Sequence, residues 1–327
     1  RMGDSLATWV AAMTTHTGST AFASAKRTML VDDLSPGGLL EAATQFDPET
    51  LTPAIQAALG ATQTGGRLAW EVCLPEAFHH DPNAKLAIMM PDWDVRRGRT
   101  HVDYSGEDVR IEIFAGRREL ISGTWQTLIE MDDEEQQACG DWSEVCEYSD
   151  DDVHYLEIEQ PWTGDMLLQR QIMLLRDDRC LLLADAVLPA QPTSSRHSIK
   201  YMGRLPLGPS IRDQPEAETR EMFLCDRARR ALVVPLSASE WQVGPTDAEL
   251  NAMGDHHLAL ATKGTARLYA PLWLDLQQRR FKRKRTWRQL TVGDQLRIVG
   301  RHEAVGYRVQ MGSEQWMVYR SLSGDCC

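Results

Sequence analysis

Two stretches of the chain decide its fold. Residues 99–125 read RTHVDYSGEDVRIEIFAGRRELISGTW, and residues 153–188 read VHYLEIEQPWTGDMLLQRQIMLLRDDRCLLLADAVL. In both, apolar residues alternate with polar ones over strand-length runs, with turn residues between the runs. Alternation with a period of two is typical of strands that bury one face of an antiparallel sheet. We therefore predict antiparallel strands, including a hairpin whose turn is residues 176–179.

The same pattern extends over most of the chain. It begins at residues 68–72 and returns at 231–236, 257–261, 266–276, 295–299, 304–310 and 315–322. No helical pattern separates these runs, so two packed sheets are needed to bury them. We predict a mainly β fold, a large antiparallel β-sandwich of the supersandwich type, over residues 67–327.

Residues 1–66 are predicted to form a short helical and loop segment. Asp4 can cap a first amphipathic helix. Two Ser/Thr-Pro pairs, at 35–36 and 52–53, are typical of helix starts, and Gly60 is a typical helix stop before a linker.

Composition limits the functional classes. Hydrophobic residues make up 43% of the 327, enough for a large core. A net charge of -12 argues against nucleic-acid binding, because the chain repels polyanions at long range. No apolar run reaches the roughly 20 residues of a membrane span. Seven cysteines without Cys-x-x-Cys spacing, and no signal peptide, favour reduced thiols and the cytoplasm over export, with a Cys139–Cys146 pair as the alternative.

The motifs of residues 99–123 follow a distinctive order. A His-x-Asp pair, a strand, a Gly-Arg turn, a second strand and a closing glycine occupy Arg99, His101, Asp103, Gly116, Arg117, Ser122 and Gly123. This order resembles the C-terminal β-sandwich domain of the heparinase II/III-like polysaccharide lyases. The segments at 155–157, 170–171, 176–179 and 183–185 resemble that domain's central hairpins.

Two positions depart from the family's pattern. Arg99 stands where the family has its first histidine, and Ser122 where it has the aspartate before the glycine. In the zinc-containing members, a histidine of the first motif and that aspartate help to hold a structural metal. Zinc takes about four ligands, so His101 and Asp103 alone do not complete such a site. We predict no metal and no cofactor.

The resemblance also implies candidate catalytic residues. The lyases carry their catalytic tyrosine and much of their sugar cleft on an N-terminal (α/α) toroid, whereas only residues 1–66 precede the predicted sandwich here. Elimination from a uronic acid needs a base, an acid for the leaving oxygen, and a cation beside the carboxylate. His101, Tyr104 and Arg99 are the candidates for these roles.

The functional prediction is a carbohydrate-related module that binds an anionic polysaccharide or forms the scaffold half of a lyase. One alternative is a polysaccharide lyase or an epimerase-like enzyme that acts on uronic-acid sugars. The other is a purely structural or assembly domain, so whether the chain is an enzyme stays open. Nucleic acid and a membrane are not expected partners, and a homo-oligomer is compatible with the sequence.

Candidate sugar-binding residues come from segments rich in arginine and tryptophan. Residues 279–288 read RRFKRKRTWR, and Trp93 lies among aspartates and arginines. Guanidinium forks suit carboxylate or sulfate groups, and indoles stack on sugar rings. The predicted binding residues are Asp103, Trp93, Arg283, Arg285 and Trp287. The alternative for 279–288 is an exposed hairpin whose basic residues protect a sheet edge.

The tryptophans are predicted to divide into two groups by their neighbours in the sequence. Those in apolar, strand-like contexts are expected in the core: Trp70, Trp125, Trp273 and Trp316. Those among polar residues are expected to be exposed: Trp93, Trp142, Trp162 and Trp287.

Two histidine pairs offer metal-capable side chains. They are His79-His80, followed by Asp81, and His256-His257. Adjacent residues of a strand point to opposite faces, so one histidine of each pair would face away from a shared ion. A metal held between the two pairs is therefore kept only as an alternative.

Overall fold

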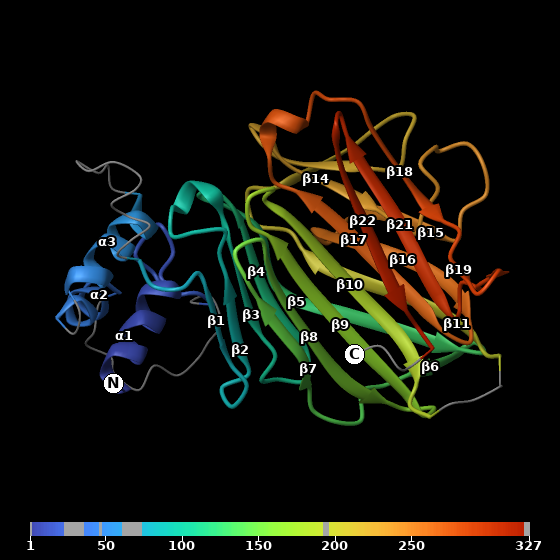
Figure 1. The fold of residues 1–327 in the computed structure, drawn as a ribbon, viewed down its shortest axis with the longest axis horizontal. Helices are drawn as coiled ribbons and strands as arrows, with labels where there is room; N and C mark the ends of the chain where they lie inside the picture. Colours follow the sequence, from blue (N-terminus) through green and yellow to red (C-terminus); the bar gives the residue numbers. More distant parts are fainter. Residues whose placement is uncertain (1, 23–35, 46–47, 61–73, 192–195, 324–327) are drawn as a thin grey trace.

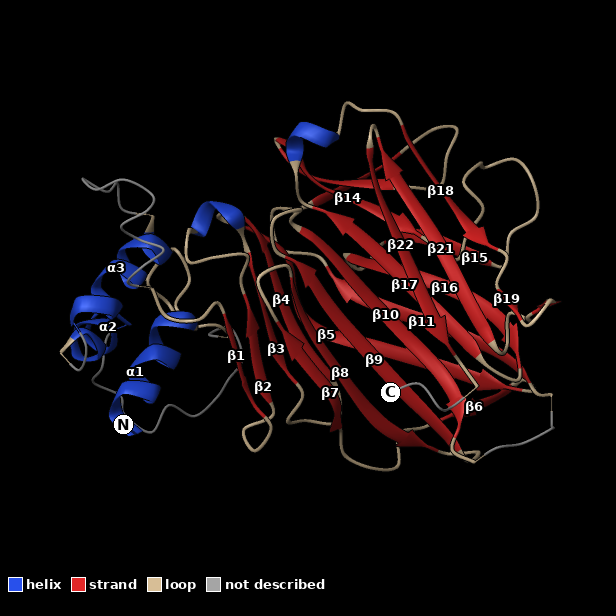
Figure 2. Cartoon of the chain, in the orientation of Figure 1, coloured by secondary structure: helices blue, strands red, loops and turns tan. Residues whose placement is uncertain are grey.

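The computed structural model describes residues 2–22, 36–45, 48–60, 74–191 and 196–323. Three helices precede the strands: α1 (Met2–Ala12), α2 (Pro36–Thr44) and α3 (Pro48–Leu59). The strand predicted at 68–72, with Trp70, and the linker after Gly60 lie outside the described residues. Figures 1 and 2 show the helices together at one end of a large body of strands.

The predicted helices are present, with two starts displaced. α1 begins at Met2, so Asp4 lies in its first turn and not at its N-cap. α3 begins at Pro48 and carries Glu49 in its first turn, so Pro53 lies inside the helix. Proline at the first helical position lacks an N–H that would in any case be unpaired, whereas Pro53 removes one internal hydrogen bond. The start predicted at 52–53 was therefore wrong. Small side chains of the three helices pack against Ile88, Met90 and Trp93 of the sandwich.

The first sheet has nine strands and borders the helices (Figure 1). Its spatial order is β1 (Phe78–Asp81), β2 (Leu86–Met89), β3 (Arg99–Asp103), β4 (Val109–Ala115), β5 (Arg118–Met131), β11 (Ser198–Pro206), β16 (His257–Thr265) and β15 (Ala248–Met253), with β6 (Glu134–Gln136) paired to β5. All strand pairs are antiparallel.

The second sheet has eight strands. Its order is β12 (Arg212–Pro215), β13 (Met222–Asp226), β14 (Ala228–Pro235), β17 (Leu268–Asp275), β10 (Cys180–Pro189), β9 (Met166–Leu175), β8 (Val153–Trp162) and β7 (Ser143–Ser149). The predicted hairpin at 176–179 is confirmed, because Leu175 of β9 pairs with Cys180 of β10.

A third sheet covers the far side of the second. It consists of β18 (Arg285–Leu290), β21 (Ala304–Met311) and β22 (Glu314–Ser321), next to a ribbon of β19 (Gly293–Asp294) and β20 (Arg297–Ile298). One apolar core fills the space between the first two sheets, and another lies between the second and third. The predicted β-sandwich is confirmed, and the third layer explains why β10 is a nearly continuous apolar run: both of its faces are buried.

The core between the first two sheets contains an ion pair. Arg170 of β9 and Asp185 of β10 are cross-strand neighbours, and two guanidinium nitrogens lie 2.8 Å from the two carboxylate oxygens. The Tyr201 hydroxyl donates to the same carboxylate at 2.6 Å. The Arg170 guanidinium also lies 3.9 Å from the centre of the Trp125 ring. These sequence positions therefore hold the two sheets together from within the core.

Two further sequence-based expectations concern membrane-spanning helices and a disulfide bond. None of the helices there is long and apolar enough to cross a bilayer. Cys139 and Cys146 are not joined by a disulfide bond, so the alternative pairing was wrong.

Candidate functional site

β3 carries Arg99 and His101, two of the three predicted catalytic residues. The third, Tyr104, directly follows the strand and points to the other face of the first sheet. Arg99 and His101 lie on the outer face of the first sheet, against the N-terminal segment. Tyr104 belongs to the apolar core between the first two sheets. The structure therefore places the side chains of Arg99 and His101 on one face of the first sheet and that of Tyr104 on the other.

His101 lies in a closed polar cluster. Its Nδ1 atom lies 3.3 Å from an oxygen of Glu112, whose other oxygen accepts a 2.8 Å hydrogen bond from the Phe22 amide. The Phe22 and Phe114 rings flank the imidazole edge-on. Burial lowers the pKa of His101, which therefore favours the neutral ring. This cluster joins the N-terminal segment to the sheet.

Arg99 and Asp103 also have hydrogen-bond partners within the protein. The Arg99 guanidinium donates to the carbonyl oxygens of Ala12 and Thr14, and burial lowers its pKa to about 10. Asp103 accepts hydrogen bonds from the amide and hydroxyl of Ser105. Both side chains thus hold local structure.

The four tryptophans expected at the surface are buried, so that prediction was wrong: Trp93, Trp142, Trp162 and Trp287. Each indole N–H donates a hydrogen bond inside the protein, to a backbone carbonyl or, for Trp162, to Gln160. A satisfied indole N–H allows the large ring to be buried among polar sequence neighbours. By contrast, Trp241 is 56% exposed, and the sequence analysis did not single it out.

Three of the seven basic residues at 279–288 pair with carboxylates. Arg283 lies 2.8 Å from Glu314, and Arg285 lies 2.6 Å from Glu221. Arg280 is fully buried against Asp275. The residues after the short 3-10 helix Gln278–Arg280 lead into β18, which pairs with β21. An anion bound by Arg283 or Arg285 would therefore compete with Glu314 or Glu221 for the guanidinium.

The histidine pairs are not brought together. His79 packs against the rings of Trp9 and Trp93, and burial lowers its pKa to about 4. His256 contacts the Gly208 carbonyl, and His257 contacts Asp255. The first pair lies on β1, at one edge of the first sheet, whereas His257 lies on β16, next to the opposite edge.

A cavity of about 560 Å³ lies where turns of the first two sheets meet the segment after α1. Its polar lining consists chiefly of five arginines and one histidine: Arg96, Arg117, Arg118, Arg179, Arg230 and His16. The arginines come from the 3-10 helix Val95–Arg97, the β4–β5 turn, the first residue of β5, the β9–β10 turn and β14, and His16 follows α1. We call this feature the arginine cavity.

The Gly-Arg turn places Arg117 in this cavity. β4 ends at Ala115 and β5 begins at Arg118, so Gly116 and Arg117 alone connect them. Gly116 has a φ of 60°, a left-handed conformation that glycine adopts without steric cost. The sequence motif was visible, but its arginine was not identified as a binding residue.

Two of the cavity's guanidiniums have only carbonyl partners in the part of the chain that the structure describes. Arg117 donates to the Gly60 carbonyl at 3.1 Å, and Arg179 donates to the carbonyls of Arg97 and Arg96. Neither forms an ion pair there. Within the described residues, the cavity therefore holds two guanidiniums that have no carboxylate ion-pair partner, in a chain whose net charge is negative.

The remaining cavity arginines are partly compensated. Arg118 lies 2.9 Å from Asp226, and Arg96 pairs with Asp94. Arg230 lies 4.0 Å from the same Asp226 carboxylate. The positive charge nevertheless acts on His16: burial lowers its pKa most, and the guanidiniums of Arg117 and Arg118 lower it further. Such a site can bind a carboxylate or a sulfate through guanidinium forks.

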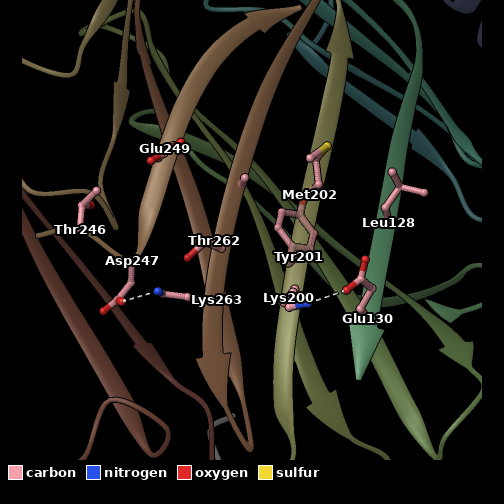
Figure 3. A pocket seen from close by; sticks show the side chains of 11 residues that line it. Leu128, Glu130, Lys200, Tyr201, Met202, Thr246, Asp247, Glu249, Thr262 and Lys263 are labelled. Carbon is pink, nitrogen blue, oxygen red and sulfur yellow. Dashed lines mark hydrogen bonds and ion pairs between the residues drawn. The ribbon is translucent and has the colours of Figure 1, made fainter. Parts of the chain in front are cut away.

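A second cavity, of about 360 Å³, lies across β5, β11, β16 and β15 (Figure 3). Its two lysines are already paired: Lys200 with Glu130 at 3.0 Å, and Lys263 with Asp247 at 3.8 Å. This cavity offers an anion no uncompensated cation among its described lining residues, so the arginine cavity is the stronger candidate site.

Comparisons with known proteins identify the fold. No protein-family model matches the chain, and no curated protein matches it in sequence. A crystal structure of the heparan sulfate lyase HepC from Pedobacter heparinus matches with a TM-score of 0.56 and 10% identity, over 88% of this chain and 48% of that one. A structure of heparinase III matches with a TM-score of 0.56 and 10% identity, over 98% and 54%.

At these identities the likeness concerns the fold alone. The chain spans about half the length of each matched structure. The resemblance of residues 99–188 to the heparinase II/III-like sandwich is thus supported as a shared architecture.

Proposed function

We propose that this chain is a carbohydrate-related module that binds an anionic polysaccharide, and that the arginine cavity is its binding site. The observation that carries the proposal is a cavity lined by five arginines, two of which, Arg117 and Arg179, have only carbonyl partners among the residues that the structure describes. The fold shared with heparan sulfate lyase and heparinase III structures favours a polysaccharide over a free small anion.

The size and charge of the arginine cavity suit an acidic sugar. Small-molecule sites occupy about 300–1,000 Å³, and this cavity of about 560 Å³ lies within that range. A uronate or sulfate group between two guanidiniums would accept charge-assisted hydrogen bonds, each contributing about 1.5–3 kcal/mol.

Replacing Arg117 and Arg179 tests this site. The variant Arg117→Gln/Arg179→Gln is expected to bind a heparin oligosaccharide about tenfold or more weakly for each guanidinium removed. The measurement is calorimetric titration at fixed ionic strength, because salt screens exposed charges.

The matched control removes two cations from the other cavity. Lys200→Gln/Lys263→Gln deletes the same charge from residues that are already paired, and it should leave the affinity within about twofold. Equal losses in both double variants would contradict the proposal, since that result indicates a delocalised charge effect. No binding of any acidic oligosaccharide by the unaltered chain would favour the structural or assembly alternative.

The affinity is also expected to rise as pH falls. Burial and the guanidiniums of Arg117 and Arg118 lower the pKa of His16, so its ring is neutral in the free cavity. A bound anion favours the protonated ring, and binding therefore takes up a proton and strengthens from about pH 8 to about pH 5. His16→Gln should flatten this dependence, and an unchanged pH profile in that variant would show that another group titrates.

A further inference from the structure

One histidine of the first pair lies between two carboxylates at the edge of the sandwich. His80 is on β1, the edge strand of the first sheet, and Glu144 and Glu147 are on β7, the edge strand of the second. His80 Nδ1 lies 2.7 Å from Glu147 Oε2 and 3.8 Å from Glu144 Oε2. One nitrogen or oxygen from each of the three residues lies within 4.8 Å of the others.

A β-bulge explains how two glutamates three positions apart face the same imidazole. In a regular strand such residues point to opposite faces. In β7 the register shifts between Glu144 and Cys146, so that Glu144 pairs with Ile158 and Glu147 with Leu156. Ile158 and Leu156 share one face of β8, and the bulge therefore turns both carboxylates toward the same side.

The burial of the three side chains forms a site that is open on one side. The His80 side chain is 0% exposed, whereas those of Glu144 and Glu147 are 29% and 39% exposed. The two carboxylates share this single ring as their ion-pair partner within the described residues. A metal ion can thus reach the carboxylate oxygens from solvent, and the buried His80 imidazole can supply a further ligand from inside the protein.

The second ring nitrogen of His80, Nε2, contacts a hydroxyl that can pair with either neutral tautomer of the imidazole. His80 Nε2 lies 2.7 Å from the Tyr104 hydroxyl. That hydroxyl can donate to Nε2 while Nδ1–H donates to Glu147, or accept from Nε2–H while the Nδ1 lone pair faces the carboxylates. Metal-bound imidazoles commonly have their second nitrogen hydrogen-bonded in this way.

We propose that His80, Glu144 and Glu147 bind one divalent zinc ion, which links the edge strands of the two sheets. Tetrahedral zinc with bonds of about 2 Å places its ligand atoms about 3.3 Å apart, a value between the two observed separations. One imidazole and two carboxylates are ligands that zinc accepts, and water would occupy the fourth position. Tyr104, predicted above as catalytic, would act as a positioning residue.

Titration of the metal-free full chain with zinc chloride tests the site. We expect about one ion per chain, a higher melting temperature, and visible absorption bands when cobalt(II) replaces zinc. The variant Glu144→Gln/Glu147→Gln keeps the shape of both side chains and should weaken zinc binding by at least about tenfold to a hundredfold, the range measured for outer partners alone.

Two controls separate this site from other ligands. Cysteine thiolates also bind zinc, and Cys146 lies between the two glutamates in the sequence. If the proposed ligands are correct, Cys146→Ser should bind zinc as tightly as the unaltered chain does. Tyr104→Phe removes only the hydroxyl and should weaken binding while leaving one ion per chain. Unchanged zinc affinity in the double glutamine variant would overturn the proposal. The double glutamine variant should bind heparin as the unaltered chain does, so the zinc site and the arginine cavity are tested independently.

Discussion

Replacing Asp185 by alanine is expected to lower the free energy of unfolding by about 3–5 kcal/mol. The carboxylate is fully buried, and it neutralises the Arg170 guanidinium at 2.8 Å through two hydrogen bonds. Its removal leaves a buried cation with only neutral partners, namely the Trp125 carbonyl and the Thr127 hydroxyl. Chemical denaturation followed by tryptophan fluorescence measures the loss.

A double variant distinguishes the effect of the buried charges from the effect of lost side-chain volume. Arg170→Met/Asp185→Leu replaces both charges with apolar side chains, and it should recover much of the loss because neither charge remains buried. The exposed Asp133, which pairs with Lys200, provides the surface control: Asp133→Ala should cost about 1 kcal/mol or less. A loss below about 1 kcal/mol for Asp185→Ala would mean that the stranded guanidinium reaches water.

A second loss of about 3–5 kcal/mol is expected for Arg280→Met. Arg280 is fully buried, and its guanidinium contacts the equally buried Asp275 at 2.7 and 2.8 Å. It also donates to Glu314 at 2.9 Å, which joins the second sheet to β22 of the third. Methionine fills a similar volume but leaves the Asp275 carboxylate without its cation.

The adjacent Arg279 provides a matched control for Arg280. Its side chain is exposed, so Arg279→Met should change stability by no more than about 0.5 kcal/mol. Comparable losses in the two variants would indicate that general charge, rather than the buried pair, stabilises the segment. The comparison also separates the structural role of residues 279–288 from the polyanion binding first expected of them.

The loss in Arg280→Met should shrink at low pH. Burial raises the pKa of Asp275, and Arg280 opposes that effect. Without Arg280 the folded-state pKa rises further above its unfolded value, so the folded form binds a proton that the unfolded form releases. Stability of the variant relative to the unaltered chain therefore improves as the pH falls towards the raised pKa of Asp275, which denaturation at several pH values would measure.

Local periodicity was sufficient to predict the sandwich and its central hairpin. The alternation around 176–179 and the turn residues there depend on neighbours within a few positions, and the structure pairs Leu175 with Cys180 as expected. Periodicity did not reveal the third sheet. The uninterrupted apolar run of β10 is compatible with burial on both faces, but which strands cover the second face is a non-local property.

The candidate sites were predictable only in part, because convergence depends on distant segments. The sequence marked the Gly-Arg turn and His80, but Arg117 meets Arg179 and Arg230 only after two sheets have packed. His80 meets Glu147 only because a bulge in another sheet re-aims that side chain. Likewise, His101 is closed over by Phe22, which lies 79 positions away along the chain, counted from 22 to 101.

The sequence by itself determined the β-rich class, the helices at the N-terminus and most strand positions, since each rests on hydrogen bonding and side-chain alternation between near neighbours. The tertiary structure alone decided which charges are neutralised. Arg280 and Arg283 look like a polyanion patch in the sequence, yet Asp275 and Glu314 neutralise them. Arg117 lies in an ordinary turn motif, yet packing leaves its guanidinium with only a carbonyl partner among the described residues. The physical reason is that a guanidinium already paired with a carboxylate of the protein is not available to an anionic ligand, and that pairing depends on residues far away in the sequence.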